Sequence, residues 1–154
     1  MSELQTFNKK LIQLDSIFHK FTDELATFSD LKKENRIIVA VSGGMDSMVL
    51  FSLLHSREKF DIVIAHVNHH LREDSNKDEF LVQRACRSLN IPFFSTSLNP
   101  EKIKKGESVE QWGRTNRYRF FNEVMEKNKA SWIMTAHHGN DQVETVLMNL
   151  SRQS

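Results

Sequence analysis

Short apolar runs and longer stretches with helical periodicity alternate along this chain. The runs cover residues 36–41, 61–67, 91–98 and 130–136, and polar or turn-forming residues bound each of them. Runs of this length predict strands, and the nearly continuous apolar character of 61–67 is typical of a strand covered on both faces in a parallel sheet. The alternation predicts an α/β fold, with a mostly parallel sheet, right-handed crossovers and helices on both faces.

Four helices are expected around these strands. Their apolar positions recur at steps of three and four residues, which is the spacing of one helical face. Ser75 or Asn76 is expected to cap the second helix, and Ser108 with Gln111 fits a capping box at the start of the third. The expected helices span residues 48–54, 75–89, 108–128 and 142–152.

Residues 4–28 carry a separate, narrow apolar stripe that predicts an N-terminal amphipathic helix. We divide the chain into this helix with its lead-in, residues 1–35, and an α/β domain, residues 36–154. The stripe is expected to pack on that domain. The alternative is a coiled-coil seam, which would make the protein a homodimer.

A glycine-rich turn joins the first strand directly to the first helix. It reads Ser42-Gly43-Gly44-Met45-Asp46-Ser47. Glycines let the backbone approach an anion closely, and a helix N-terminus adds unpaired N–H groups and a favourable dipole. The turn lacks the lysine of a P-loop and the spaced glycines of a Rossmann fingerprint. We expect residues 42–47 to hold the pyrophosphate portion of ATP, with the hydroxyls of Ser42 and Ser47 adding bonds.

Asp46 is not expected to touch a phosphate directly, since two negative charges repel each other. Its expected role is to bind a Mg²⁺ ion that bridges the phosphates, or to orient a reacting group. The alternative is that Asp46 only caps the first helix.

A polar cluster also follows the second strand, and the carboxyl ends of parallel strands are where such sheets bind ligands. The cluster holds His66, His69, His70 and Arg72. Imidazoles there could donate to a triphosphate or carry protons, and Arg72 could neutralise developing charge. His70 is expected to be an ordinary polar residue. A zinc site is not favoured, because neither a cysteine nor a Glu-x-x-His pattern accompanies the histidines.

Two further groups complete the candidate site. Arg114 and Arg117 are three residues apart on one helix face, where one anion could meet both, unless this is simply a solvated basic face. His137 and Asp141 are four apart at the expected start of the last helix, and Glu144 continues that face. A carboxylate beside an imidazole could act as a base or orient an attacking amine, and the alternative is a capping Asp141 beside a structural histidine.

Composition narrows the class of protein. Of the 154 residues, 39% are hydrophobic and 27% charged, and the formal net charge of +1 gives no global basic field. The single cysteine, Cys86, excludes an intramolecular disulfide and fits a reducing compartment. The chain has no apolar run of about eighteen residues that could span a membrane and no secretory signal pattern, so we expect a cytoplasmic protein without membrane contact.

Four motifs in order carry a family resemblance. They are the turn of residues 42–47, Ala65-His66-Val67-Asn68-His69-His70-Leu71-Arg72, Glu110-Gln111-Trp112-Gly113-Arg114 with residues 117–121, and residues 135–145. The turn resembles the PP-loop of ATPases that split ATP between its α and β phosphates. From Arg36 to its end the chain resembles the N-terminal domain of tRNA(Ile)-lysidine synthetases, with mild departures at Gly113 and Asn140.

The resemblance implies a ligase that modifies tRNA. ATP would adenylate the wobble cytidine of an isoleucine tRNA, tRNA(Ile), bearing the CAU anticodon, with release of pyrophosphate. The ε-amine of free L-lysine would then expel AMP and form lysidine. By motif match, residues 42–47 would bind ATP with Asp46 positioning Mg²⁺ or the reacting groups, Arg114 would face the activated nucleotide, and His137 and Asp141 would serve the reaction centre. We add His66 and His69 to the expected ATP-binding residues.

Other interpretations stay open. The family pattern continues beyond Ser154, so the domain of residues 36–154 is interpreted as truncated at its C-terminal end. The chain could therefore be a nucleotide-binding fragment without full activity. It could also be another PP-loop tRNA-modifying enzyme such as a thiolase, although a single cysteine argues against sulfur transfer. The weakest alternative treats residues 4–28 as a helical interaction segment.

Overall fold

The computed structural model describes residues 36–57, 60–130, 132–139 and 142–149, together with Asp23. The predicted amphipathic helix of residues 4–28 lies outside the described residues except for Asp23, so its packing and the homodimer stay predictions. The described elements are β1 (Arg36–Ala40), α4 (Met45–Arg57), β2 (Asp61–Asn68), α5 (Ser75–Leu89), β3 (Phe93–Ser97), the 3₁₀ helix η1 (Pro100–Lys102), α6 (Val109–Asn128), β4 (Trp132–Gly139) and β5 (Gln142–Asn149).

The five strands form one sheet in the order β3-β2-β1-β4-β5. Strands β3, β2, β1 and β4 run parallel, and β5 pairs antiparallel with β4. In the register of the central strand, Val39 lies between Ile64 of β2 and Met134 of β4. The predicted mostly parallel sheet is therefore confirmed.

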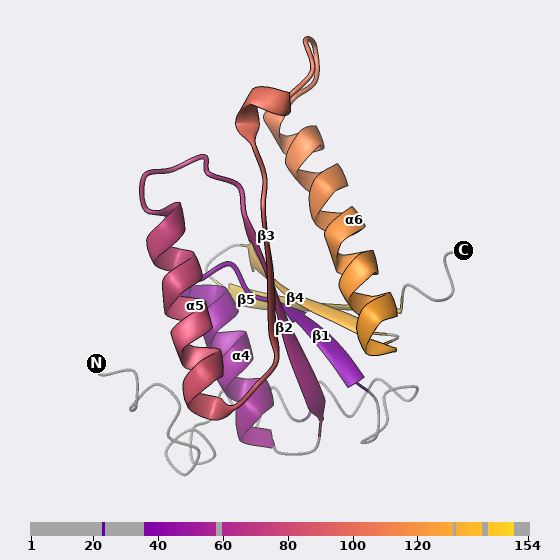
Figure 1. The fold of residues 1–154 in the computed structure, drawn as a ribbon. Coiled ribbons are helices and arrows are strands. Elements are labelled where there is room, and N and C mark those ends of the chain that lie inside the picture. The colour runs from indigo at the N-terminus through magenta and orange to yellow at the C-terminus, as the bar shows by residue number, and fades with distance from the viewer. Residues whose placement is uncertain (1–22, 24–35, 58–59, 131, 140–141, 150–154) are drawn as a thin grey trace.

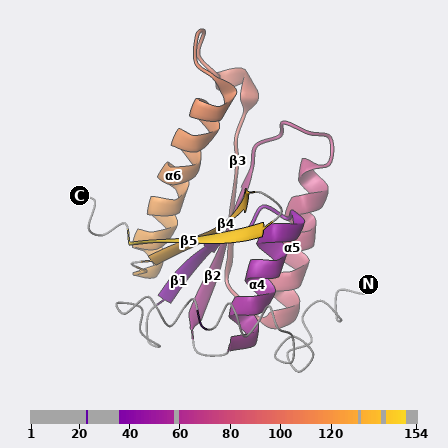
Figure 2. The ribbon, with the colours of Figure 1, turned by 180° about the vertical axis from the view of Figure 1, so that it is seen from behind.

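Helices cover both faces of this sheet, as Figure 1 and the opposite view in Figure 2 show. Helices α4 and α5 pack on one face, where the core includes Ile37 and Val39. Helix α6 packs on the other face, where the core includes Ile38 and Val63. Successive residues of β1 thus point into different cores, and both cores exclude water. This explains why the strand sequences are apolar without alternation.

The sequence predicts capping residues for two of the helices, and the structure confirms one of them. The predicted cap of α6 is confirmed, since the Ser108 hydroxyl accepts a hydrogen bond from the Gln111 N–H at 3.0 Å. The predicted cap of α5 is wrong, because Asp74 occupies the cap position and makes no side-chain cap bond. Ser75 and Asn76 instead bond to the preceding loop: Ser75 Oγ accepts from the Arg72 N–H, and Asn76 Oδ1 accepts from Asn68 Nδ2.

The predicted last helix, residues 142–152, is also wrong. Residues 142–149 form β5, and β4 continues to Gly139, so that the two strands make a hairpin. The β-branched residues Val143, Thr145 and Val146 favour a strand. The positions Val143, Val146 and Leu147 have the spacing of a helical face, so periodicity favoured the helix that the structure does not have here.

None of the described helices is long and apolar enough to cross a membrane.

Candidate active site

The carboxyl end of β1 is the topological switch point of the sheet. From β1 the chain moves outward to β2 and β3 on one side, and then returns to β4 on the other side of β1. Ligands of open α/β sheets bind at such a point, outside the carboxyl ends of the strands. The glycine-rich turn of residues 42–47 lies there, between β1 and the first turn of α4.

The Ser47 hydroxyl stabilises the turn through hydrogen bonds to its backbone. Its hydroxyl accepts hydrogen bonds from the N–H groups of Ser42 at 3.1 Å and Gly43 at 3.2 Å, and it donates to the Gly44 carbonyl at 3.0 Å. The Ser42 hydroxyl lies 3.1 Å from the Ser47 hydroxyl and accepts from the Gly44 N–H. Both hydroxyls are thus engaged within the turn, and their predicted bonds to phosphate stay untested.

The backbone at the start of α4 supplies donors of another kind. The first N–H groups of a helix have no partner inside the helix, and α4 begins at Met45. Together with the helix dipole they make a cradle that suits an anion such as a phosphate. Ser47 holds the backbone that shapes this cradle, so its hydroxyl acts on the site through the conformation of the turn.

Ser47→Ala should lower the free energy of unfolding by about 1–2 kcal/mol, because it leaves two backbone N–H groups of the turn without their acceptor. Chemical denaturation would measure this change. Ser52→Ala is the matched control, since Ser52 lies in the same helix and its hydroxyl only donates to the Val49 carbonyl. A control variant as destabilised as Ser47→Ala would contradict the role given to Ser47.

Gly43 brings the turn against α5. Its φ of +90° is in the left-handed region, which favours glycine. A Cβ placed on Gly43 would lie 2.8 Å from the Cβ of Asp78 and 3.1 Å from the Asp78 backbone oxygen. The first turn of α5 therefore packs directly on the glycine-rich turn, and only a residue without a side chain fits between them.

His66 supports the turn from β2. The side chain is buried, and its Nδ1 lies 2.7 Å from the carbonyl oxygen of Val41, the residue before the turn. A carbonyl can only accept, so Nδ1 carries the proton of this hydrogen bond. Nε2 is buried and has no hydrogen-bond partner among the described residues. The imidazole thus holds the end of β1 in place.

His69 is packed against α6. Its ring meets the Trp112 ring edge-on with centroids 6.4 Å apart, and its Cδ2 lies 3.3 Å from where a Cβ on Gly113 would be. Partial burial lowers the pKa of His69, and the positive charges of Arg117 and, more weakly, His66 lower it further. At neutral pH the ring is therefore uncharged and can donate or accept one hydrogen bond.

The two predicted arginines share one face of α6. The guanidinium carbons of Arg114 and Arg117 lie 5.9 and 6.0 Å from the centre of the Tyr118 ring. Arg114 is exposed at the surface, whereas Arg117 is close enough to His69 to affect its pKa. The structure thus brings together the turn, the histidines of β2 and the first half of α6.

Comparison with known proteins decides the family. Residues 14–154 match the model of a PP-loop domain. The chain belongs to the PP-loop family. Curated relatives include tRNA(Ile)-lysidine synthases of Lactiplantibacillus plantarum (42% identical over 86% of this chain and 30% of the relative), Clostridium acetobutylicum (45%, over 80% and 28%) and Petrotoga mobilis (37%, over 97% and 46%). The resemblance predicted from the motifs is therefore confirmed, and the chain spans less than half the length of each of these relatives.

A solved structure of low sequence identity has the same fold as this chain. The U34-tRNA thiolase NcsA from Methanococcus maripaludis superposes with a TM-score of 0.66 at 18% identity, over 82% of this chain and 48% of the thiolase. This likeness shows the α/β fold of the PP-loop domain and no more.

The predicted pairing of His137 with Asp141 on a helix is wrong, because that helix is absent from the described hairpin. His137 lies in β4, two residues beyond Thr135, the partner of Ala40, and its backbone pairs with Glu144 of β5. His137 is therefore level with the start of the PP-loop. The side chain of His137 and all of Asp141 lie outside what the structure describes, as do the side chains of Met45 and Asp46, so their roles stay predictions.

Four residues of this region had no role assigned from the sequence alone. Asp78 packs on Gly43, and Trp112 and Gly113 enclose His69. Asn68 is buried, and its side-chain oxygen accepts from the His70 N–H. Asn68, Trp112 and Gly113 stand inside the quoted motifs, which was a usable signal. Asp78 stands outside them, and its contact is made only by the tertiary fold.

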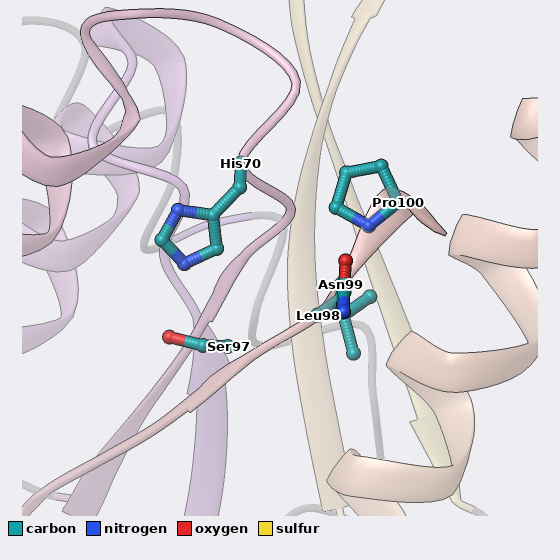
Figure 3. A pocket seen from close by; sticks show the side chains of 5 residues that line it. All are labelled: His70, Ser97, Leu98, Asn99 and Pro100. Carbon is teal, nitrogen blue, oxygen red and sulfur yellow. The ribbon is translucent and has the colours of Figure 1, made fainter. Parts of the chain in front are cut away.

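A small pocket lies one strand away from the PP-loop, at the carboxyl ends of β2 and β3. Its volume is about 250 Å³, and Figure 3 shows His70 and Ser97 on one side of it and Leu98, Asn99 and Pro100 on the other. His70 is exposed, with a φ of +53° that the bond from its N–H to Asn68 stabilises. Within the described part of the chain, no three His, Cys, Asp or Glu side chains gather as metal ligands.

Proposed function

We propose that this chain provides the ATP-binding and adenylating part of a tRNA(Ile)-lysidine synthetase. ATP would adenylate the wobble cytidine of a tRNA(Ile) with the CAU anticodon and release pyrophosphate. The ε-amine of free L-lysine would then attack the activated carbon, expel AMP and leave lysidine. The overall reaction is that of a ligase forming a C–N bond, and a tRNA substrate would place it in the cytoplasm.

The observation that carries this proposal is the PP-loop at the switch point of the sheet. Its backbone is held by Ser47, it is followed at once by the N-terminus of α4, and it contains a glycine that no larger residue can replace without a clash. Such a cradle suits a polyphosphate. The relatives named tRNA(Ile)-lysidine synthases support the choice of nucleic-acid substrate.

The proposed residue roles follow the match of this sequence to the family's motifs. Residues 42–47 would bind the phosphates of ATP, with His66 and His69 beside them. Asp46 would hold a Mg²⁺ ion, which supplies positive charge to neutralise the phosphates. Arg114 would face the activated nucleotide, and His137 and Asp141 would serve the amine that attacks.

The thiolase alternative has little support from the cysteine. Cys86 is buried in the core beneath α5, and burial raises the pKa of its thiol to about 12. A thiol of that kind stays protonated at neutral pH, whereas sulfur transfer needs a reactive thiolate. From a different class, the second candidate is a nucleotide-binding module without catalysis.

Pyrophosphate release from ATP by this chain tests the proposal, with L-lysine and a tRNA(Ile) bearing the CAU anticodon added separately and together. We expect release that depends on the tRNA, and AMP with lysidine only when lysine is also present. The control is the same tRNA with the wobble cytidine replaced by uridine. Saturable ATP binding without release would favour the binding module, and absence of both would refute the site.

A further inference from the structure

An ion pair stands directly beside the PP-loop. The Arg72 guanidinium donates to Asp78 Oδ2 at 2.8 Å. Asp78 is the residue of α5 that packs on Gly43, so its carboxylate lies next to the loop that is proposed to take the phosphates. The Arg72 side chain is 74% exposed, while that of Asp78 is only 26% exposed. The carboxylate is thus the more buried partner, and the guanidinium is the partner exposed to a ligand.

We propose that Asp78 is a positioning residue that holds Arg72 beside the PP-loop, where the guanidinium binds the polyphosphate of the nucleotide. This inference rests on the proposed binding of ATP at the loop. A guanidinium has five N–H donors in a planar fork, so it can keep one bond to a carboxylate and offer others to phosphate oxygens. Two bonds already restrain the arginine: the side chain to Asp78, and its backbone N–H to Ser75 Oγ.

Charge gives a reason for the pair to exist at this place. A carboxylate beside a polyphosphate site repels the ligand unless a cation compensates it. Arg72 removes that repulsion and adds donors of the kind that recognise phosphate. Asp78 therefore has two opposite effects on ATP binding: it helps through Arg72 and hinders through its own charge. Which effect dominates depends on whether Arg72 is present.

Titration of the whole chain with MgATP and, separately, with adenosine tests whether Arg72 binds the polyphosphate. We expect Arg72→Gln to weaken ATP binding by about 10-fold, the size of one charge-assisted hydrogen bond, and to leave adenosine binding unchanged. Arg72→Lys should fall in between, because it keeps the charge without the fork. Arg87→Gln is the matched control, since it removes an exposed arginine from the last turn of α5, the helix that carries Asp78. ATP binding of Arg72→Gln at the level of the unchanged protein would overturn the inference.

The direction in which Asp78→Asn changes the ATP affinity tests whether Asp78 positions Arg72. In the unchanged background this substitution should weaken ATP binding by about 3-fold, because Arg72 loses its charged partner. In the Arg72→Gln background it should strengthen ATP binding, because only the repulsion remains to be removed. Stronger ATP binding in both backgrounds would overturn the positioning role. Equal losses for ATP and adenosine would indicate a merely structural role and would overturn it too. An unchanged protein that binds no ATP would refute the proposed function itself.

Discussion

Gly43→Ala should weaken ATP binding by about 100-fold, which corresponds to a loss of about 3 kcal/mol of binding free energy. Alanine at a φ of +90° is strained by about 1–2 kcal/mol, and its Cβ would lie 2.8 Å from the Cβ of Asp78. The PP-loop and the first turn of α5 must then separate, which moves the N–H groups that form the cradle. Titration with MgATP would measure the affinity, and thermal unfolding would measure the accompanying loss of stability.

Gly106→Ala is the control that separates backbone strain from the clash. Gly106 has a similar φ of +87°, but a Cβ there would meet nothing within 4 Å. Its substitution should therefore cost about 1 kcal/mol of stability and leave ATP affinity unchanged. If Gly43→Ala behaved like Gly106→Ala in both measurements, the close approach of Asp78 would have no importance for the site.

Features that depend on residues close together in the chain were predictable from the sequence. The apolar runs of β1 and β2 were recognisable because a strand buried on both faces has to be apolar at successive positions, as Ile37, Ile38 and Val39 are. The cap at Ser108 was predictable because the residues that bond each other stand three apart in the chain. The PP-loop was found for a similar reason, since the hydrogen bonds that the Ser42 and Ser47 hydroxyls make lie within residues 42–47.

Features made by the tertiary fold were not predictable. Asp78 meets Gly43 only because α5 packs on the same face of the sheet as α4, and no spacing in the chain signals that contact. Strand β5 was missed because Val143, Val146 and Leu147 have the three-and-four spacing of a helical face, whereas pairing with the edge of β4 makes the segment a strand. The sequence predicts His66 at the site, and only the structure shows that its Nδ1 is already engaged by the Val41 carbonyl.

His66→Gln should weaken ATP binding far more than His66→Asn, and this is the second large effect that we expect. The Nδ1–H of the imidazole bonds to the carbonyl oxygen of Val41, and both residues are 2% exposed. The amide nitrogen of asparagine can occupy the place of Nδ1, whereas that of glutamine reaches the place of Nε2. His66→Gln therefore leaves the buried Val41 carbonyl without its donor, at a cost of about 1–3 kcal/mol, and frees the backbone that leads into the PP-loop.

The two variants distinguish a histidine that positions the loop from one that touches the nucleotide. If His66 acts through Val41, ATP affinity should fall by about 30-fold or more in His66→Gln and by less than about 3-fold in His66→Asn. If Nε2 contacts the nucleotide, the order reverses, because only glutamine keeps a polar atom there. Both substitutions remove part of a buried ring, so both lower the stability through the cavity they leave. The ratio of the two affinities, measured well below both unfolding temperatures, is independent of that shared cost and decides which nitrogen of His66 serves ATP binding.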